Sequence, residues 1–157
     1  MSVAKPMVAS FDRTGTGLEY LQRIIDGEYA PLAIGETLGF RIAAAERGKV
    51  TIRGRPDERS LNLLNTVHGG WSAAVLDTAM ALSNLTLLSA EQSFTTLDIR
   101  INYLRPITLQ TGEVVAEGGV INGGRRVAYC EAKLMDSAGK LLAHGTGTCL
   151  ILPREAT

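Results

Sequence analysis

The sequence predicts an α+β domain in which one antiparallel sheet wraps a long central helix. Residues 71–88 are apolar on nearly every face of a helix, and residues 95–152 alternate with the period of strands between tight turns. A helix that is apolar all round is buried, so we expect the strands to cover it. Because a single sheet covers only part of such a helix, we also expect the chain to dimerise through the sheet edge.

In the first half of the chain, spacing and turn residues predict three shorter elements. Residues 17–25 carry apolar side chains at helical spacing, and Gly27 follows as a stop signal. Residues 40–46 and 50–53 read as strands joined by a turn at residues 47–48. We therefore expect a short amphipathic helix followed by a hairpin.

The second half predicts four strands. Residues 95–103 alternate, with residues 95, 97, 99, 101 and 103 on one face and Thr96 on the other, and the strand ends at Arg105-Pro106. The next three strands are expected to form an antiparallel meander. They span residues 112–122, 126–136 and 140–152.

Length and charge exclude several functional classes. The chain has 157 residues, enough for one core, and we expect residues 1–16 to form a tail and residues 17–157 a single domain. Its 16 basic and 16 acidic side chains cancel, so no positive field favours nucleic acid or an anionic membrane. No apolar run has a membrane span's length, and without a secretory signal we expect a cytoplasmic protein.

The cysteines and histidines show no ligand motif. Cys130 and Cys149 are far apart in sequence and have no CxxC spacing, which makes a metal site or a disulfide framework an unfavourable interpretation. Both lie in predicted strands among apolar residues, so we expect buried free thiols. His144 alternates with Leu142 and Thr146 and is expected to be a structural or surface histidine.

Asp77 is the first residue that points to chemistry. It is the only ionisable residue between His68 and Glu91, in the most apolar helix of the chain. Burying an unpartnered carboxylate costs several kcal/mol, so the residue either caps a loop or pairs with an arginine such as Arg100, or it serves catalysis. Small neighbours on its helical face leave room beside the carboxylate. They are Ala73, Ala74 and Ala81.

The tripeptide His68-Gly69-Gly70 is the second such feature. The glycines either form a simple loop-to-helix joint or leave bare N–H groups at the positive end of the helix, where an oxyanion can bind. Nine residues after His68 comes the carboxylate of Asp77. An oxyanion site and a carboxylate on one helix are the groups that acyl transfer requires.

With these motifs the sequence resembles the hotdog-fold acyl-CoA thioesterases of the phenylacetate-degradation type. The resemblance covers about residues 38–152 and implies the hotdog fold, hydrolysis of an acyl-CoA, and a homo-oligomer, either a dimer or a dimer of dimers. It rests on several ordered blocks: residues 62–70 (NLLNTVHGG), 76–79 (LDTA), 95–98 (TTLD), 102–106 (NYLRP), 124–128 (GRRVA) and 139–145 (GKLLAHG).

The resemblance implies a role for each matching residue. Asp77 matches the essential carboxylate, acting as nucleophile or as general base toward water. The N–H of Gly69 matches the group that polarises the thioester carbonyl. Thr96 matches a Ser or Thr that helps to position the nucleophilic water. Asn62 matches an asparagine that holds the water or orients the site, and His68 lies near the thioester. Asp77 would come from one subunit and the loop with Asn62, His68 and Gly69 from its partner.

The coenzyme A moiety of the substrate would bind near the later hairpin, with Tyr103 packing against the pantetheine arm. Arginine suits phosphate because its guanidinium forms bidentate bonds, although adjacent arginines beside a turn are often only solvated. The resemblance calls for no metal and no cofactor. The residues expected near the phosphates are Asn122, Gly123, Gly124, Arg125 and Arg126.

Two features depart from the family pattern, and two other functions stay open. Asn65 stands where many relatives have glycine, and asparagine tolerates the left-handed conformation that such a turn needs. Strand alternation puts Thr96 on the polar face, so it reaches the site only if that face borders the subunit boundary.

The alternative functions are a non-catalytic acyl-CoA-binding module and a hydratase or dehydratase acting on acyl thioesters.

Overall fold

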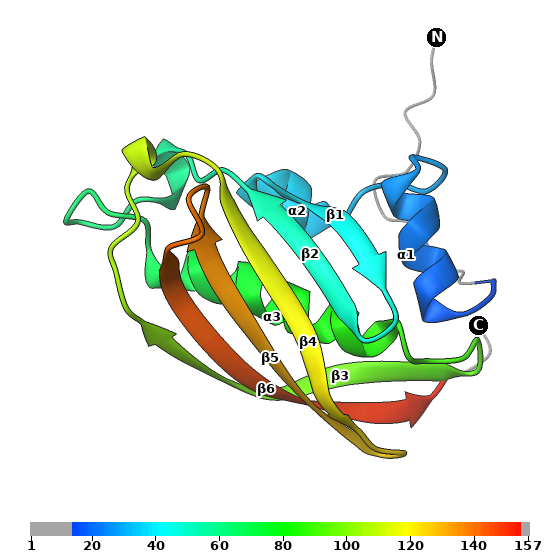
Figure 1. Ribbon diagram of the computed structural model, residues 1–157. Helices are drawn as coiled ribbons and strands as arrows, with labels where there is room; N and C mark the ends of the chain where they lie inside the picture. The colour runs from blue at the N-terminus through cyan, green and yellow to red at the C-terminus, as the bar shows by residue number, and fades with distance from the viewer. Residues whose placement is uncertain (1–13, 155–157) are drawn as a thin grey trace, which may run out of the picture.

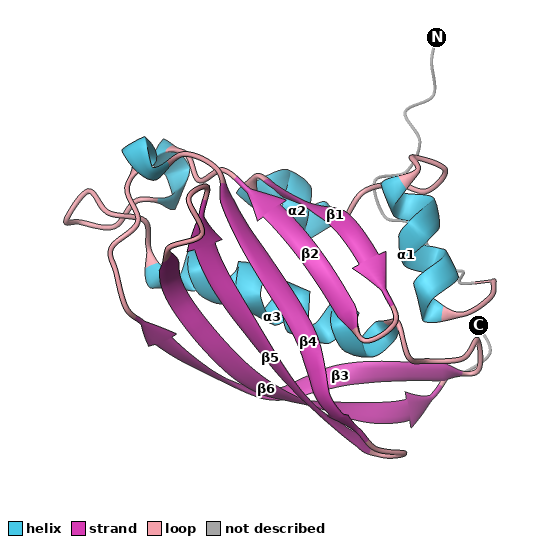
Figure 2. Cartoon of the chain, viewed as in Figure 1, coloured by secondary structure: helices cyan, strands magenta, loops and turns pink. Residues whose placement is uncertain are grey.

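The computed structural model describes residues 14–154, which form a six-stranded antiparallel sheet around one long helix (Figure 1). The strand order is β1-β2-β4-β5-β6-β3, with α3 against one face and α1 beside β1 (Figure 2). The predicted α+β architecture is confirmed. The elements are α1 Gly17–Ile25, α2 Ala33–Leu38, β1 Phe40–Glu46, β2 Lys49–Gly54, α3 Gly69–Leu85, β3 Gln92–Tyr103, β4 Val114–Gly123, β5 Val127–Asp136 and β6 Leu141–Pro153, with short 3-10 turns at Glu58–Ser60 and Leu109–Thr111.

Helix α1 has the predicted bounds and a sequence-encoded start. Thr16 is the N-cap, and its side chain and that of Glu19 form a capping box. Beyond the C-terminus Gly27 has a φ of +79°, a conformation that glycine adopts without strain. Residues 1–13 of the expected tail lie outside the described residues.

Helix α2 was not predicted, because it has only six residues and contains Gly35. Gly35 lies inside the helix, where an added Cβ would approach the carbonyl oxygen of Phe40 to 2.4 Å. Gly39 ends the helix in the left-handed region, with a φ of +75°. The glycines therefore form a tight entry from helix into strand β1.

The sheet contains the predicted hairpin and meander, and it places β1 and β3 at its two edges. Strands β1 and β2 form the hairpin, and β4, β5 and β6 form the meander. Strand β3 pairs with β6 along its whole length and has no second partner among the described strands. Its outer edge therefore presents unpaired backbone groups to a possible partner chain.

One side of α3 supplies the centre of the core. Val75, Leu76, Ala79 and Met80 are at most 1% exposed, and burying each large apolar side chain stabilises the fold by about 1.5–3 kcal/mol. At Gly118 the backbone of β4 approaches α3 so closely that an added Cβ would lie 2.1 Å from the carbonyl oxygen of Ala79. Within residues 14–154, neither α3 nor another helix is long and apolar enough to cross a membrane.

The other side of α3 is not fully covered, which differs from the expected all-round burial. Ala73, Ala74, Asp77 and Thr78 are each partly exposed and follow one another at helical spacing. The physical reason is that the sheet curves around α3 from one side only (Figure 1). A strip of small and polar side chains therefore faces outward beside the edge strand β3.

Because the helix lies directly on Gly118, replacing this residue with alanine is expected to destabilise the fold by roughly 2–3 kcal/mol through overpacking. Gly119→Ala is the matched control, since the nearest atom to its added Cβ is 4.0 Å away. Its effect should stay within about 0.5 kcal/mol. Urea denaturation of the two variants measures the difference, and equal midpoints would contradict the close packing.

Candidate active site

The N-terminus of α3 is built by His68 and two glycines. His68 is the N-cap, and its Nδ1 accepts a hydrogen bond of 2.9 Å from the N–H of Gly70. In the neutral ring the proton is therefore on Nε2. The N–H of Gly69 has no acceptor within residues 14–154, so this donor is available at the positive end of the helix.

Tyr103, at the end of β3, holds the same helix terminus. Its hydroxyl donates to the carbonyl oxygen of Gly69 at 2.8 Å, and an added Cβ on Gly69 would lie 3.0 Å from the tyrosine ring. A pocket of about 380 Å³ opens beside them. Its lining comprises Thr66, Val67, Gly69, Ser72, Tyr103, Leu104, Arg105, Pro106, Ile107, Leu142 and Ala143.

Asp77 lies halfway along α3 and is held by a hydroxyl group. Thr96 Oγ1 donates to Asp77 Oδ1 at 3.0 Å, the one hydrogen bond of this carboxylate within the described residues. No lysine or arginine of residues 14–154 forms an ion pair with it, so the considered pairing with Arg100 is wrong. The second carboxylate oxygen is therefore available to water or to a substrate.

A β-bulge at Leu97 explains how Thr96 reaches Asp77. The register between β3 and β6 shifts there by one residue, which changes the face on which the following side chains lie. Phe94 and Thr96 face α3 before the bulge, and Ile101 and Tyr103 face it afterwards. The uninterrupted alternation predicted for this strand, with Thr96 on the polar face, is therefore wrong.

Gly69 and Asp77 do not meet within one chain. They lie eight residues apart on α3, which corresponds to about 12 Å along the helix axis. An atom in contact with the carboxylate is therefore too far from the Gly69 N–H of the same chain to contact that group as well. Within one chain the two groups are separate.

Asn62 belongs to the Gly69 end and shapes the loop of residues 61–67. Its Oδ1 accepts from the N–H of Leu64 at 2.8 Å, and its Nδ2 donates to the hydroxyl of Thr66 at 2.9 Å. Asn65 has a φ of +55°, the conformation expected where relatives carry glycine. The loop projects from the body at the left of Figure 1, with Leu63 and Leu64 exposed at its tip.

The residues expected around coenzyme A are divided between the two ends of α3. Tyr103 is at the N-terminal end, whereas the turn of residues 123–126 is at the other end (Figure 1). An added Cβ at Gly123 would lie 3.1 Å from Leu87, just beyond the helix C-terminus. Arg125 and Arg126 are exposed, and neither forms an ion pair within the described residues.

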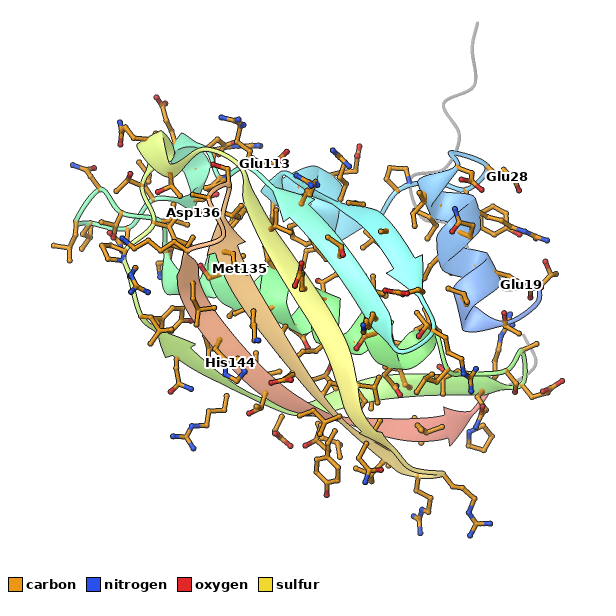
Figure 3. The ribbon with its side chains drawn as sticks, viewed as in Figure 1. Glu19, Glu28, Glu113, Met135, Asp136 and His144 are labelled. Atoms are coloured by element: carbon orange, nitrogen blue, oxygen red, sulfur yellow. The ribbon has the colours of Figure 1, made fainter. Side chains whose placement is uncertain are left out.

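The two cysteines are buried free thiols, as predicted. A hydrogen bond with Cys130, together with burial and the nearby charge of Asp77, raises the pKa of the Cys149 thiol. Cys149 thus lies behind the Asp77–Thr96 pair as a neutral group. His144 lies on the sheet face turned away from α3 (Figure 3), and its Nε2 is 3.1 Å from Glu131 Oε2, which fits the structural role expected of it.

Asn84, which sequence patterns did not single out, is the unexplained polar residue of α3. It is 1% exposed, and neither Oδ1 nor Nδ2 has a hydrogen-bond partner. Leaving such a group unsatisfied costs about 1–3 kcal/mol. The buried neighbours Ser83 and Thr86 do have hydrogen-bond partners, because their hydroxyls donate to backbone carbonyl oxygens at 2.6 Å. Within residues 14–154, no cluster of His, Cys, Asp or Glu could hold a metal ion.

Comparisons with known proteins agree with this architecture. The profile of the thioesterase superfamily matches residues 64–143. Human acyl-coenzyme A thioesterase 13 is 30% identical over 110 residues, which cover 68% of this chain and 76% of the relative. A thioesterase structure from Haemophilus influenzae superposes with a TM-score of 0.74 at 26% identity, covering 90% of this chain and 93% of the other. A phenylacetic acid degradation-related protein from Ralstonia eutropha superposes with a TM-score of 0.76 at 29% identity, covering 83% of this chain and 98% of the other. The chain therefore belongs to the thioesterase superfamily and is a thioester hydrolase with the hotdog fold.

Proposed function

We propose that the protein hydrolyses an acyl-CoA to a free acid and coenzyme A, at two equivalent sites that each combine residues from two copies of the chain. The observation that carries the proposal is the separation, by about 12 Å, of the Gly69 N–H from the Asp77–Thr96 pair. Each part lacks what the other supplies. The name of the human relative, an acyl-coenzyme A thioesterase, supports coenzyme A as the thiol.

Two copies of α3 related by a two-fold axis would complete both sites at once. If the helices lie antiparallel with Ala73 near the axis, Gly69 of each chain lies beside Asp77 of the other. The exposed strip of α3 supports this arrangement, because Ala73 and Ala74 are small enough to let the helices approach closely. The symmetry produces two identical sites for each dimer.

The free edge of β3 and the loop of residues 61–67 support the same dimer. The edge offers a long row of unpaired backbone groups, which an antiparallel copy of β3 would satisfy. Leu63 is fully exposed and Leu64 is 82% exposed at the loop tip, where a second chain would bury them. Pairs of such dimers would give the alternative oligomer, a dimer of dimers.

Two chemical routes fit the proposed site. As a general base, Asp77 takes a proton from water while the water oxygen bonds to the thioester carbon. As a nucleophile, its carboxylate bonds to that carbon and forms a mixed anhydride, which water then cleaves. In both routes the C–S bond breaks and the thiolate of coenzyme A leaves and takes up a proton. The charge that develops on the carbonyl oxygen is stabilised by the partner's Gly69 N–H.

Thr96, His68 and Asn62 serve this chemistry in different ways. Thr96 holds one oxygen of Asp77 and so directs the other toward the substrate or water. His68 uses Nδ1 for the helix cap, which leaves Nε2–H free to donate to the thioester or to water. Asn62 acts as a positioning residue, because its side chain holds the loop that carries this end of the site.

We also assign the coenzyme A moiety to Tyr103 and the turn between β4 and β5. Tyr103 lies in the pocket beside Gly69, where it would contact the pantetheine arm. The turn residues Asn122, Gly123 and Gly124 would supply backbone and amide contacts to phosphate. Arg125 and Arg126 carry charges that no ion pair within the described residues neutralises, so they are available to phosphate.

Replacing Asp77 with asparagine should lower kcat by about a thousandfold or more, because the base or nucleophile is lost. The asparagine oxygen still accepts from Thr96, so the fold should be retained. Thiol release from phenylacetyl-, benzoyl- and straight-chain acyl-CoA esters measures the effect. Undiminished release would contradict the proposal. If the wild type binds these esters tightly but releases no thiol, the protein is a binding module. If it hydrates an enoyl-CoA, it is a hydratase.

Gly69→Pro removes the proposed oxyanion donor, and the extended ψ of 136° at His68 suits a proline at the helix start. The new Cβ would lie 3.0 Å from the Tyr103 ring, which must shift by a few tenths of an ångström to make room. The substitution should lower kcat by about 10²–10³. Subunits of Gly69→Pro mixed with Asp77→Asn form heterodimers with one intact site. The mixture should therefore regain about a quarter of wild-type activity. Failure to regain activity, with mixed dimers demonstrated by mass spectrometry, would mean that the sites are not shared.

Arg125→Gln combined with Arg126→Gln should raise KM for an acyl-CoA about tenfold, because charge-assisted phosphate contacts are lost. KM for the matching acyl-pantetheine, which lacks the nucleotide phosphates, should not change. Lys133→Gln on the outer face of the sheet is the control. Equal KM changes for both esters would indicate that the arginines act on the fold and not on the phosphates.

A further inference from the structure

We infer that Cys149 is a positioning residue for the hydrolysis, because its thiol fixes the Thr96 hydroxyl in the orientation that holds Asp77. The inference rests on the proposed function, in which Asp77 acts on the thioester. The sequence indicated only a buried free thiol at this position. The starting observation is the strand pairing, in which Thr96 and Cys149 lie directly opposite each other in the ladder of β3 and β6.

The two side chains meet on the face of the sheet that covers α3. The hydroxyl of Thr96 reaches Asp77 on this face, and Cys149 is 2% exposed and belongs to the core. In an antiparallel pair of strands, the Cβ atoms of directly opposite residues are about 4.5–5.5 Å apart. Two short side chains on one face are therefore in contact, and the thiol and the hydroxyl form a hydrogen bond.

The Thr96 hydroxyl has a single proton, which decides the direction of this hydrogen bond. That proton is donated to Asp77 Oδ1 at 3.0 Å, so toward Cys149 the hydroxyl oxygen can only accept. The thiol keeps a proton to donate, because a hydrogen bond with Cys130, burial and the charge of Asp77 raise its pKa. The S–H of Cys149 therefore donates to Thr96 Oγ1, and the O–H of Thr96 donates to the carboxylate.

Cys130 is the second neighbour of the Cys149 thiol, and it lies farther from the carboxylate. It is on β5, which is on the other side of β6 from Thr96, and it is 1% exposed. The negative charge of Asp77 turns nearby dipoles so that their protons point toward it. This field favours donation from Cys149 to Thr96 over donation to Cys130.

A fixed Thr96 hydroxyl matters because it makes the one hydrogen bond of Asp77 within the described residues. A hydroxyl group rotates to suit its partners, so a second bond at its oxygen restricts it to the orientation that points at the carboxylate. If the hydroxyl turns away, the free oxygen of Asp77 loses its direction toward water or the thioester carbon. The buried thiol does not contact the substrate, so its loss should change kcat and not KM.

The kinetic test measures thiol release from the acyl-CoA ester that the wild type hydrolyses fastest. Cys149→Ala removes the donor and should lower kcat about fivefold, with KM changed by less than about twofold. Cys149→Ser keeps a donor of similar size and should keep kcat within about twofold of the wild-type value. Cys130→Ala is the matched control, because it removes an equally buried thiol from the strand beyond β6, and it should keep kcat as well.

A double-mutant cycle separates positioning from a merely structural role. Thr96→Val alone should lower kcat at least about tenfold, because the carboxylate loses its donor. Adding Cys149→Ala to this variant should lower kcat no further, since the thiol acts only through the hydroxyl. Effects that multiply, an unchanged kcat in Cys149→Ala, an equal loss in Cys130→Ala or a failed rescue by Cys149→Ser would each overturn the inference.

The S–H stretching band in the infrared spectrum gives a readout that does not depend on catalysis. The chain has two cysteines, so Cys130→Ala leaves Cys149 as the only thiol. Adding Thr96→Val should move its band to a higher frequency, because the S–H loses its acceptor. An unchanged frequency would overturn the inference even in an active enzyme. The proposed function fails on a different result, which is an undiminished rate in Asp77→Asn.

Discussion

A single sheet covers only one side of a helix, and this constraint governs the rest of the structure. Val75, Leu76 and Ala79 bury the covered side of α3 in the core, and β4 approaches that side at Gly118. The uncovered side keeps Asp77 accessible between small residues. The element that holds the core together thus also carries the carboxylate, and in the proposed dimer a second chain would cover its open side.

Periodicity predicted most of the fold because α3 and the strands are long and bury side chains at regular spacing. Helix α2 has only six residues and contains Gly35, so neither periodicity nor propensity reveals it. The bulge at Leu97 eluded prediction for another reason. One extra residue reverses the faces of a strand, and the apolar residues of β3 fit either phase.

The residues of the candidate site also differ in whether the sequence could predict them. Asp77 and Gly69 were recognisable from local pattern, since a lone carboxylate in an apolar helix and a bare helix terminus both stand out. Thr96 came from the family resemblance and conflicted with simple alternation until the bulge explained its direction. Asn84 left no signal, because a sequence does not show whether a buried amide finds a partner.

The bulge at Leu97 also decides which side chains of β3 can face α3 together. Before it, Thr96 faces the middle of α3, and after it, Tyr103 faces the helix terminus. These two residues are seven positions apart, and in a regular strand an odd separation would put them on opposite faces of the sheet. The one extra residue therefore lets a single strand contact both the carboxylate and the end of the helix that carries it.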